Sequence, residues 1–183
     1  MTVSVSMTVN GSQVGPIDIP DDLMMLEFLQ EYLNLTGTRL GCGQGVCRAC
    51  TILVDDDQGS QTALACITGA TWFSGRTLRT IEGHASRDAD GNVTAVSPVQ
   101  QAFLDGFAFQ CGYCTPGFVN AGTALVERLA RTPVARDSVE DVVLEALNGN
   151  ICRCTGYVRY LTSLRDLILA TEGLTLVNAL DPS

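Results

Sequence analysis

Three cysteines stand within nine residues in the stretch GCGQGVCRAC, which runs from Gly41 to Cys50. Thiols this close together suit a disulfide network, a zinc ion or an iron-sulfur cluster, and each choice limits how the surrounding chain can fold. The three alternatives also make different demands on the other cysteines, of which the chain has eight in all. The position and spacing of those cysteines therefore help to decide among them.

The first twenty residues, MTVSVSMTVNGSQVGPIDIP, contain no basic segment followed by an apolar run and no twin arginine. We read no export signal in them and expect a reducing, cytoplasmic environment. Export together with a partner subunit that carries the signal, to a membrane-associated or periplasmic location, is the alternative. In a reducing compartment clustered cysteines are more often metal ligands or redox groups than disulfides.

The cysteines fall into two groups of four, and four thiolates are what one metal centre needs. The first group has the spacing C-x4-C-x2-C with a fourth cysteine further on, which is typical of plant-type [2Fe-2S] ferredoxins. A zinc ribbon would instead show two paired C-x2-C knuckles. The expected ligands of this first centre are Cys42, Cys47, Cys50 and Cys66, with Cys66 on a strand predicted in TALACI.

The second group lies in QCGYCTPG and NICRCTGY, and each pair of cysteines stands just before a predicted helix. Free N–H groups and the positive end of the helix dipole favour a thiolate or an anionic cluster there. We therefore expect two helices to converge on one cluster. A zinc site with four thiolates remains open, although a C-x-C pair is less usual for structural zinc. The expected ligands are Cys111, Cys114, Cys152 and Cys154.

The pattern of the first half predicts a small sheet with one helix. Residues 2–9 alternate, Asn10-Gly11 suits a tight hairpin turn, and the chain returns over 12–19. Asp21 and Asp22 are expected to cap a helix with apolar residues at helical spacing. Three short β-type runs follow, and this order is that of a β-grasp sheet. The runs are 51–54, 62–67 and 76–81.

The second half reads as helical, which makes the predicted fold class α+β. Each helix begins at a recognisable cap, such as Ser97 before Pro98 or Thr115 before Pro116. The expected organisation is a β-grasp ferredoxin-like domain over 1–82, a polar linker over 83–96, a four-helix-bundle [2Fe-2S] domain over 97–171 and a tail over 172–183. The predicted helices cover 97–108, 115–131, 137–147 and 157–172.

Composition excludes two classes of partner. The chain carries eleven basic residues against twenty acidic ones and a net charge of −9, with no basic stripe for nucleic acid. Its apolar runs are interrupted by charges well before the eighteen or so residues of a membrane span. We therefore expect no nucleic-acid partner and no direct membrane insertion.

Taken together, GCGQGVCRACTILVD, QCGYCTPGFV and NGNICRCTGY resemble the small iron-sulfur subunit of the molybdenum hydroxylases, the family of xanthine dehydrogenase, aldehyde oxidoreductase and carbon monoxide dehydrogenase. The resemblance runs from the first strand to Thr171. It implies two [2Fe-2S] clusters, the second of which lies nearest the molybdopterin of a large partner subunit that oxidises an aldehyde or N-heterocycle. It also implies that Gln110 and Cys154 lie against the pterin, and that electrons leave through the first cluster to an FAD-binding or haem-containing cytochrome c subunit.

Arg48 departs from the family pattern, in which a glycine usually separates the second and third ligands. The added cation should favour the reduced form of the first cluster, or it faces an acceptor protein. The linker is also longer than the family minimum.

Outside the cysteine motifs, few residues offer other chemistry. His84, the single histidine, is expected to be a solvated linker residue, and the chain alone should hold no catalytic site. Trp72 and Phe73 are expected in the core, and Tyr113 and Tyr157 are expected to shield the second cluster. Two rival functions remain: a zinc-binding interaction module without a redox role, and a free-standing two-cluster ferredoxin.

Overall fold

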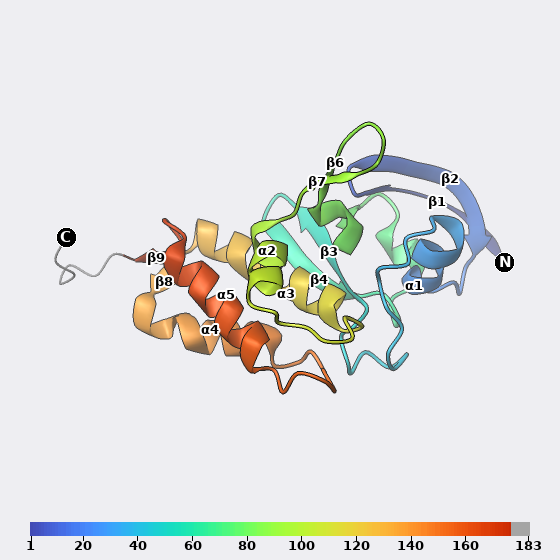
Figure 1. The fold of residues 1–183 in the computed structure, drawn as a ribbon. Coiled ribbons are helices and arrows are strands. Elements are labelled where there is room, and N and C mark those ends of the chain that lie inside the picture. Colours follow the sequence, from blue (N-terminus) through green and yellow to red (C-terminus); the bar gives the residue numbers. More distant parts are fainter. Residues whose placement is uncertain (177–183) are drawn as a thin grey trace.

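The computed structural model describes residues 1–176 and places a five-stranded sheet beside a group of helices (Figure 1). The strand order is β2-β1-β5-β3-β4, in which β1 runs parallel to β5 and the other neighbours are antiparallel. This mixed sheet confirms the predicted β-grasp arrangement and the α+β class. Its strands are β1 (Thr2–Val9), β2 (Ser12–Pro20), β3 (Thr51–Asp56), β4 (Gly59–Leu64) and β5 (Thr77–Arg79).

The first hairpin forms where the sequence predicts it. Asn10 and Gly11 have φ angles of 51° and 80°, so both central residues take the left-handed conformation that a tight turn requires. The alternation of β1 buries Val5, Met7 and Val9 against the core.

The helix that follows is shorter than predicted. A single turn, α1 (Met25–Glu27), continues into a π-helical turn over Phe28–Tyr32. Neither predicted acidic cap is used, because Met24 occupies the N-cap without a side-chain bond and Asp21 instead accepts a hydrogen bond from the N-terminal amine.

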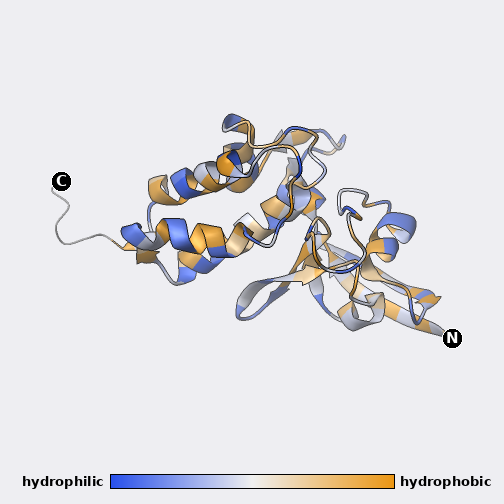
Figure 2. Cartoon of the chain, turned by 90° about the horizontal axis from the view of Figure 1, so that it is seen from below, coloured by the Kyte–Doolittle hydropathy of each residue, from blue (hydrophilic) through white to orange (hydrophobic). Residues whose placement is uncertain are grey.

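The four predicted helices are present: α2 (Pro98–Asp105), α3 (Thr115–Arg131), α4 (Val139–Leu147) and α5 (Val158–Ala170). Ser97 caps α2 in a reciprocal arrangement with Gln100, in which each side chain accepts from the other's backbone N–H. The cap of α3 differs from the prediction, since Cys114 is the N-cap and Thr115 already lies inside the helix. Polar and apolar residues share each helix surface, as Figure 2 shows. No helix among residues 1–176 is long and apolar enough to cross a bilayer.

The segment predicted as a polar linker contains local structure. A 3-10 turn covers Ile81–His84, and a small hairpin follows with β6 (Ser86–Arg87) and β7 (Val93–Ala95). The tail predicted from residue 172 begins with β9 (Thr175–Leu176), which pairs with β8 (Val134–Ala135). Residues 177–183 of that tail lie outside the described residues. Two further 3-10 turns cover Ala70–Phe73 and Arg136–Ser138.

His84 is wrongly predicted as solvated. Its Nε2 lies 2.6 Å from Oδ1 of the buried Asn120 on α3, and Asn120 in turn donates to the carbonyl of Thr51 at 2.6 Å. Burial lowers the pKa of His84. The histidine therefore belongs to the contact between the sheet and the helices.

A charged cluster supports the same contact. Arg79 on β5 donates to both oxygens of Asp55 at 2.7 and 2.8 Å and to both oxygens of Glu127 on α3 at 2.8 Å. Ser60 also bonds to both acids. Burial would raise the pKa of Asp55 and of Glu127, but the bonds from Arg79 outweigh it and both pKa values are lowered.

Replacement of Arg79 by alanine should lower the free energy of unfolding by about 1–3 kcal/mol, because two partly buried carboxylates would be left facing each other. Urea denaturation followed by circular dichroism measures this. Arg165→Ala, at the exposed Arg165–Asp166 pair, is the matched control and should change the same free energy by less than about 0.5 kcal/mol.

The effect of Arg79→Ala should also depend on pH. Because the folded pKa values are lowered from 3.8 and 4.5, the stabilisation is fully present above those values and is lost as the pH falls through the folded ones. The difference between wild type and variant should therefore shrink on acidification. A difference that stays constant between neutral and strongly acidic pH would show that Arg79 acts through packing alone.

Candidate functional site

The first cysteine group is assembled by one loop and by the pairing of β3 with β4. Thr51 pairs with Leu64, and the N–H of Ala65 donates to the carbonyl of Cys50 at 3.2 Å, which brings Cys66 next to Cys50. Cys66 lies in the turn after β4, so its prediction on a strand is wrong. Strand β4 ends at Leu64, and the chain turns directly afterwards over residues 65–67.

Backbone geometry fits the loop to the sulfur atoms. The N–H groups of Cys47 and Gln44 lie 3.4 Å from Sγ of Cys42, and they lower its pKa to about 6. Gly41 leaves necessary room, since a Cβ there would lie 2.7 Å from Sγ of Cys47. Amide donors that stabilise a thiolate in this way would also offset the negative charge of a cluster.

The second group is built where α3 and α5 begin. Cys114 is the N-cap of α3, while Cys152 and Cys154 lie in the loop before α5. The first turns of these helices touch, because the Tyr160 hydroxyl lies 2.7 Å from Oγ1 of Thr115.

Hydroxyl groups surround the buried sulfurs of this group. Oγ1 of Thr155 donates to Sγ of Cys152 at 3.1 Å, and the Tyr160 hydroxyl lies 3.7 Å from Sγ of Cys114. Burial raises the pKa of Cys114 to about 12. The contact of Tyr160 with Cys114 could not be predicted from the sequence, because no local pattern says which face of α5 meets Cys114, whereas Thr155 lies only three residues from Cys152.

In each group the sulfurs approach one another two by two. Sγ of Cys154 lies 3.5 Å from Sγ of Cys111. The other thiols lie close enough to shift the pKa of a neighbour, Cys42 with Cys47, Cys50 with Cys66 and Cys114 with Cys152. A two-iron core has room for two thiolates on each iron, so the donor sets fit [2Fe-2S] clusters.

A single zinc ion requires a different arrangement, in which four donor atoms surround one metal position tetrahedrally. The approach of the thiols in pairs matches the two-iron core.

The two groups lie against each other. A cavity of about 600 Å³ between the loops is lined by six of the eight cysteines. The N–H of Ile151, next to Cys152, donates to the carbonyl of Cys47 at 3.0 Å, so one hydrogen bond joins the two loops. Tyr113 adds a second link by donating to the carbonyl of Leu40 at 2.7 Å. Neither contact could be predicted from the sequence.

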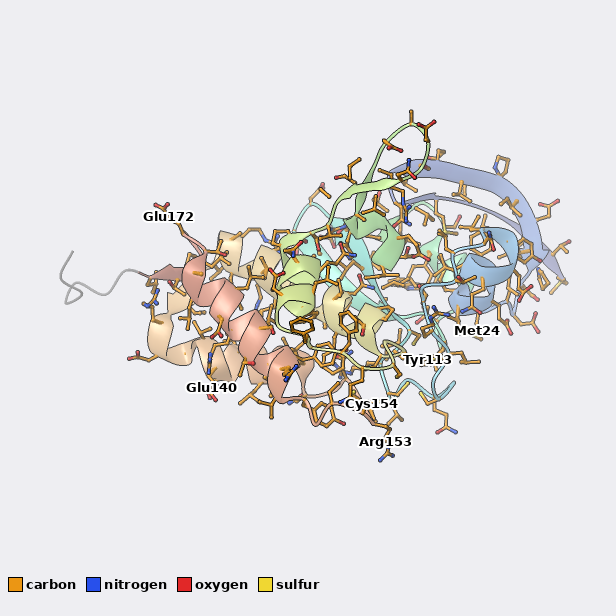
Figure 3. All side chains as sticks on the ribbon, viewed as in Figure 1. Met24, Tyr113, Glu140, Arg153, Cys154 and Glu172 are labelled. Carbon is orange, nitrogen blue, oxygen red and sulfur yellow. The ribbon has the colours of Figure 1, made fainter. Side chains whose placement is uncertain are left out.

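One side of the second group is open to solvent. Cys111 and Cys154 are exposed, whereas Cys114 and Cys152 are buried. Cys154 and Tyr113 lie at the same edge of the molecule, together with Arg153 (Figure 3). Gln110 is also exposed and precedes Cys111 directly. The residues expected at a pterin thus share an accessible edge.

The aromatic residues expected around the cysteine groups differ in their burial. Phe73 is buried as predicted. Trp72 is wrongly predicted as core, since half of its surface is exposed and Arg76 lies over its ring at 3.9 Å. The hydroxyl of Tyr157 accepts from the N–H of Cys152 at 3.2 Å. Tyr157 is therefore tied to the loop that it is expected to shield.

Known proteins show the same two units in the same order. Residues 7–71 match the family described as 2Fe-2S iron-sulfur cluster binding domain, and residues 80–165 match the [2Fe-2S] binding domain. The nicotine 6-hydroxylase small subunit of Paenarthrobacter nicotinovorans is 38% identical over 165 residues, which cover 90% of this chain and 88% of the relative.

The similarity extends to structure and to larger proteins. The crystal structure of quinoline 2-oxidoreductase from Pseudomonas putida 86 matches with a TM-score of 0.73 and 30% identity, over 94% of this chain and 93% of that one. Aldehyde oxidase 1 of Cavia porcellus is 38% identical over 155 residues, which cover 81% of this chain. The chain spans only 11% of that relative's length. The chain contains two cluster-binding units, and it matches small subunits of hydroxylases over most of their length. The chain therefore belongs to the family of small [2Fe-2S] subunits of the molybdenum hydroxylases.

Proposed function

We propose that the chain transfers single electrons from the molybdopterin site of a large partner subunit to an FAD-binding or cytochrome c subunit. The observation that carries this proposal is the contact of the two cysteine groups, which share one cavity and are joined by the bond from Ile151 to Cys47. Clusters held there would lie next to each other inside one chain. When bound, the two [2Fe-2S] clusters supply one-electron redox chemistry.

The chain's own residues have distinct roles in this proposal. Electrons enter beside the exposed edge formed by Gln110, Cys111 and Cys154, where the amide of Gln110 and the loop of Cys154 meet the pterin. They leave beside the glycine-rich loop of the first group. The proposed ligands are Cys111, Cys114, Cys152 and Cys154 for the second cluster and Cys42, Cys47, Cys50 and Cys66 for the first.

Supporting residues set the environment of the sulfurs. Amide N–H groups bond to Cys42, and hydroxyl groups of Thr155 and Tyr160 lie beside Cys152 and Cys114. Hydrogen bonds to cluster ligands tune the reduction potential by stabilising negative charge. Arg48 takes φ +57°, the left-handed conformation that a glycine adopts without strain. Its guanidinium group lies against Gly149 and lines a cleft with Arg128 and Arg131, which supports the expectation that it faces a partner protein.

The division of the chain into units over 1–82, 97–171 and the segments between and after them is part of the proposal. Two separate hydrophobic cores support it, one built on the sheet and one on the helices. The partner is expected to oxidise an aldehyde or N-heterocycle, and relatives named for nicotine, nicotinate and caffeine support the second class. Cytoplasmic location is the proposed default.

The proposed function is tested by purifying the tagged chain from its native host and adding substrate candidates under nitrogen. We expect a large molybdenum-containing subunit to co-purify, and substrate to bleach the visible absorbance of both clusters before an acceptor restores it. A chain that purifies alone with both clusters loaded would point to a free-standing ferredoxin instead.

A further inference from the structure

A polar cleft of about 630 Å³ lies between strand β4 and helices α3 and α4. Figure 1 shows α3 beside the sheet. The charged residues that line the cleft are Arg48, Arg128 and Arg131 together with one acid, Glu145. The chain as a whole has twenty acidic and eleven basic residues, so three arginines around one cleft run against its overall charge. The cysteine centres do not use this cleft.

These arginines have no acidic partner within the described part of the chain. The ion pairs among residues 1–176 involve the N-terminal amine, Arg79 and Arg165 only. Two of the guanidinium groups lie directly on glycine: a Cβ at Gly59 would collide with Arg131, and one at Gly149 would collide with Arg48. The glycines hold the two charges at opposite ends of the cleft.

A second observation points to a bound group. Asn150 lines the cleft, is only 2% exposed and has an Oδ1 atom without a hydrogen-bond partner in residues 1–176. Buried polar atoms without partners are costly, and native structures usually satisfy them. The atom is closed to solvent in this structure, so an occupant with a backbone or side-chain N–H would satisfy it once the Asn150 side chain turns toward the cleft.

The wall of the cleft suggests the shape of that occupant. Strand β4 is an edge strand, and residues 60–62 face the cleft from it. An unpaired strand edge can accept a further extended segment by main-chain hydrogen bonding. Six residues of strand span about 20 Å. The arginines follow this edge from Arg131, at the Gly59 end, to Arg48 near the cysteine loop.

We propose that this cleft binds an extended acidic segment of a partner subunit, which adds to the edge of β4 and places its carboxylates on Arg48, Arg128 and Arg131. Guanidinium groups bind carboxylates through paired N–H bonds, which fits a cleft lined by Arg128 and Arg131 from α3 and Arg48 from the cysteine loop. The proposal rests on the chain being a subunit of a larger assembly. It also explains the charge of Arg48, since that residue would lie between the docked segment and the first cysteine group.

A fluorescein-labelled hexapeptide of alternating glutamate and valine tests the proposal by fluorescence anisotropy with the cluster-loaded full chain. We expect saturable binding that weakens with salt and falls about tenfold or more in the Arg128→Ala, Arg131→Ala double variant. Arg87→Ala, which removes an equally exposed charge outside the cleft, is the control and should bind like wild type. Lysine variants at 128 and 131 should recover part of the affinity.

Three further outcomes decide the matter. Bound peptide should slow amide hydrogen exchange over residues 60–64, and unchanged exchange there would overturn the proposal. Equal binding of a lysine-containing twin peptide would overturn it as well. Arginine-dependent binding of inorganic pyrophosphate without binding of the peptide would identify a compact phosphate ligand instead. If the wild-type chain holds no iron, the proposed function fails. If the chain holds iron but does not bind the peptide, only the proposal for the cleft fails.

Discussion

Replacement of Cys114 by alanine is expected to remove the second cluster and leave the first. The variant should hold about two irons per chain instead of about four. Cys152 would lose the sulfur with which it is paired, and three thiolates cannot complete the centre. Electron transfer from the large subunit to the acceptor should fall to background. The empty position would lie between the remaining first cluster and the edge that is proposed to meet the pterin.

The fold should survive this change. Cys114 caps α3 without a side-chain hydrogen bond to the helix backbone, so alanine leaves the helix start intact. Cys50→Ala is the reciprocal variant and should remove the first cluster only. Iron analysis and electron paramagnetic resonance of both variants measure the result. If the signals of both clusters disappear together in each variant, the two cysteine groups do not form independent centres.

Replacement of Tyr160 by alanine should cost about 3–5 kcal/mol in the free energy of unfolding, which is the range for a large aromatic side chain lost from a core. Tyr160 is fully buried, stacks on Phe118 at 4.0 Å between ring centroids and meets Phe103 edge-on at 5.1 Å. Its loss would leave a cavity directly behind the second cysteine group. Urea denaturation of the cluster-loaded chain under nitrogen measures the effect.

Tyr160→Phe separates packing from the hydroxyl group. The rings remain stacked, so the variant should lose only about 0.5–1.5 kcal/mol. The hydroxyl can donate to a Cys114 thiolate while accepting from Thr115, and its removal should lower the potential of the second cluster. The potential of the first cluster is the internal control. An unchanged second potential would show that Tyr160 contributes packing alone.

Local signals in the sequence predicted much of this fold. The dipeptide Asn10-Gly11 favours positive φ angles, and Ser97 and its capping partner Gln100 lie three residues apart. The first three ligands of the first group were readable in the same way, because Cys42, Cys47 and Cys50 lie within nine residues. Each of these features depends on residues that are close together in the sequence.

The errors involve contacts that the sequence does not encode locally. His84 is partly buried because it meets Asn120, thirty-six residues further along the chain. Trp72 is exposed on the turn that buries its neighbour Phe73, and hydrophobicity alone does not indicate which side of that turn faces the core. The bond from Ile151 to Cys47 and the arginine cleft arise from the packing of helices on the sheet. Such long-range pairings follow from tertiary structure and leave no mark on spacing.

The most direct measurement is the iron and acid-labile sulfide content of the purified full chain, together with its electron paramagnetic resonance spectrum after reduction. We expect about four irons and four sulfides per chain and two distinguishable [2Fe-2S] signals that broaden each other through their proximity. A colourless chain that binds zinc alone after anaerobic reconstitution, or one that holds a single cluster, would contradict the assignment of eight cysteines to two adjacent iron-sulfur centres.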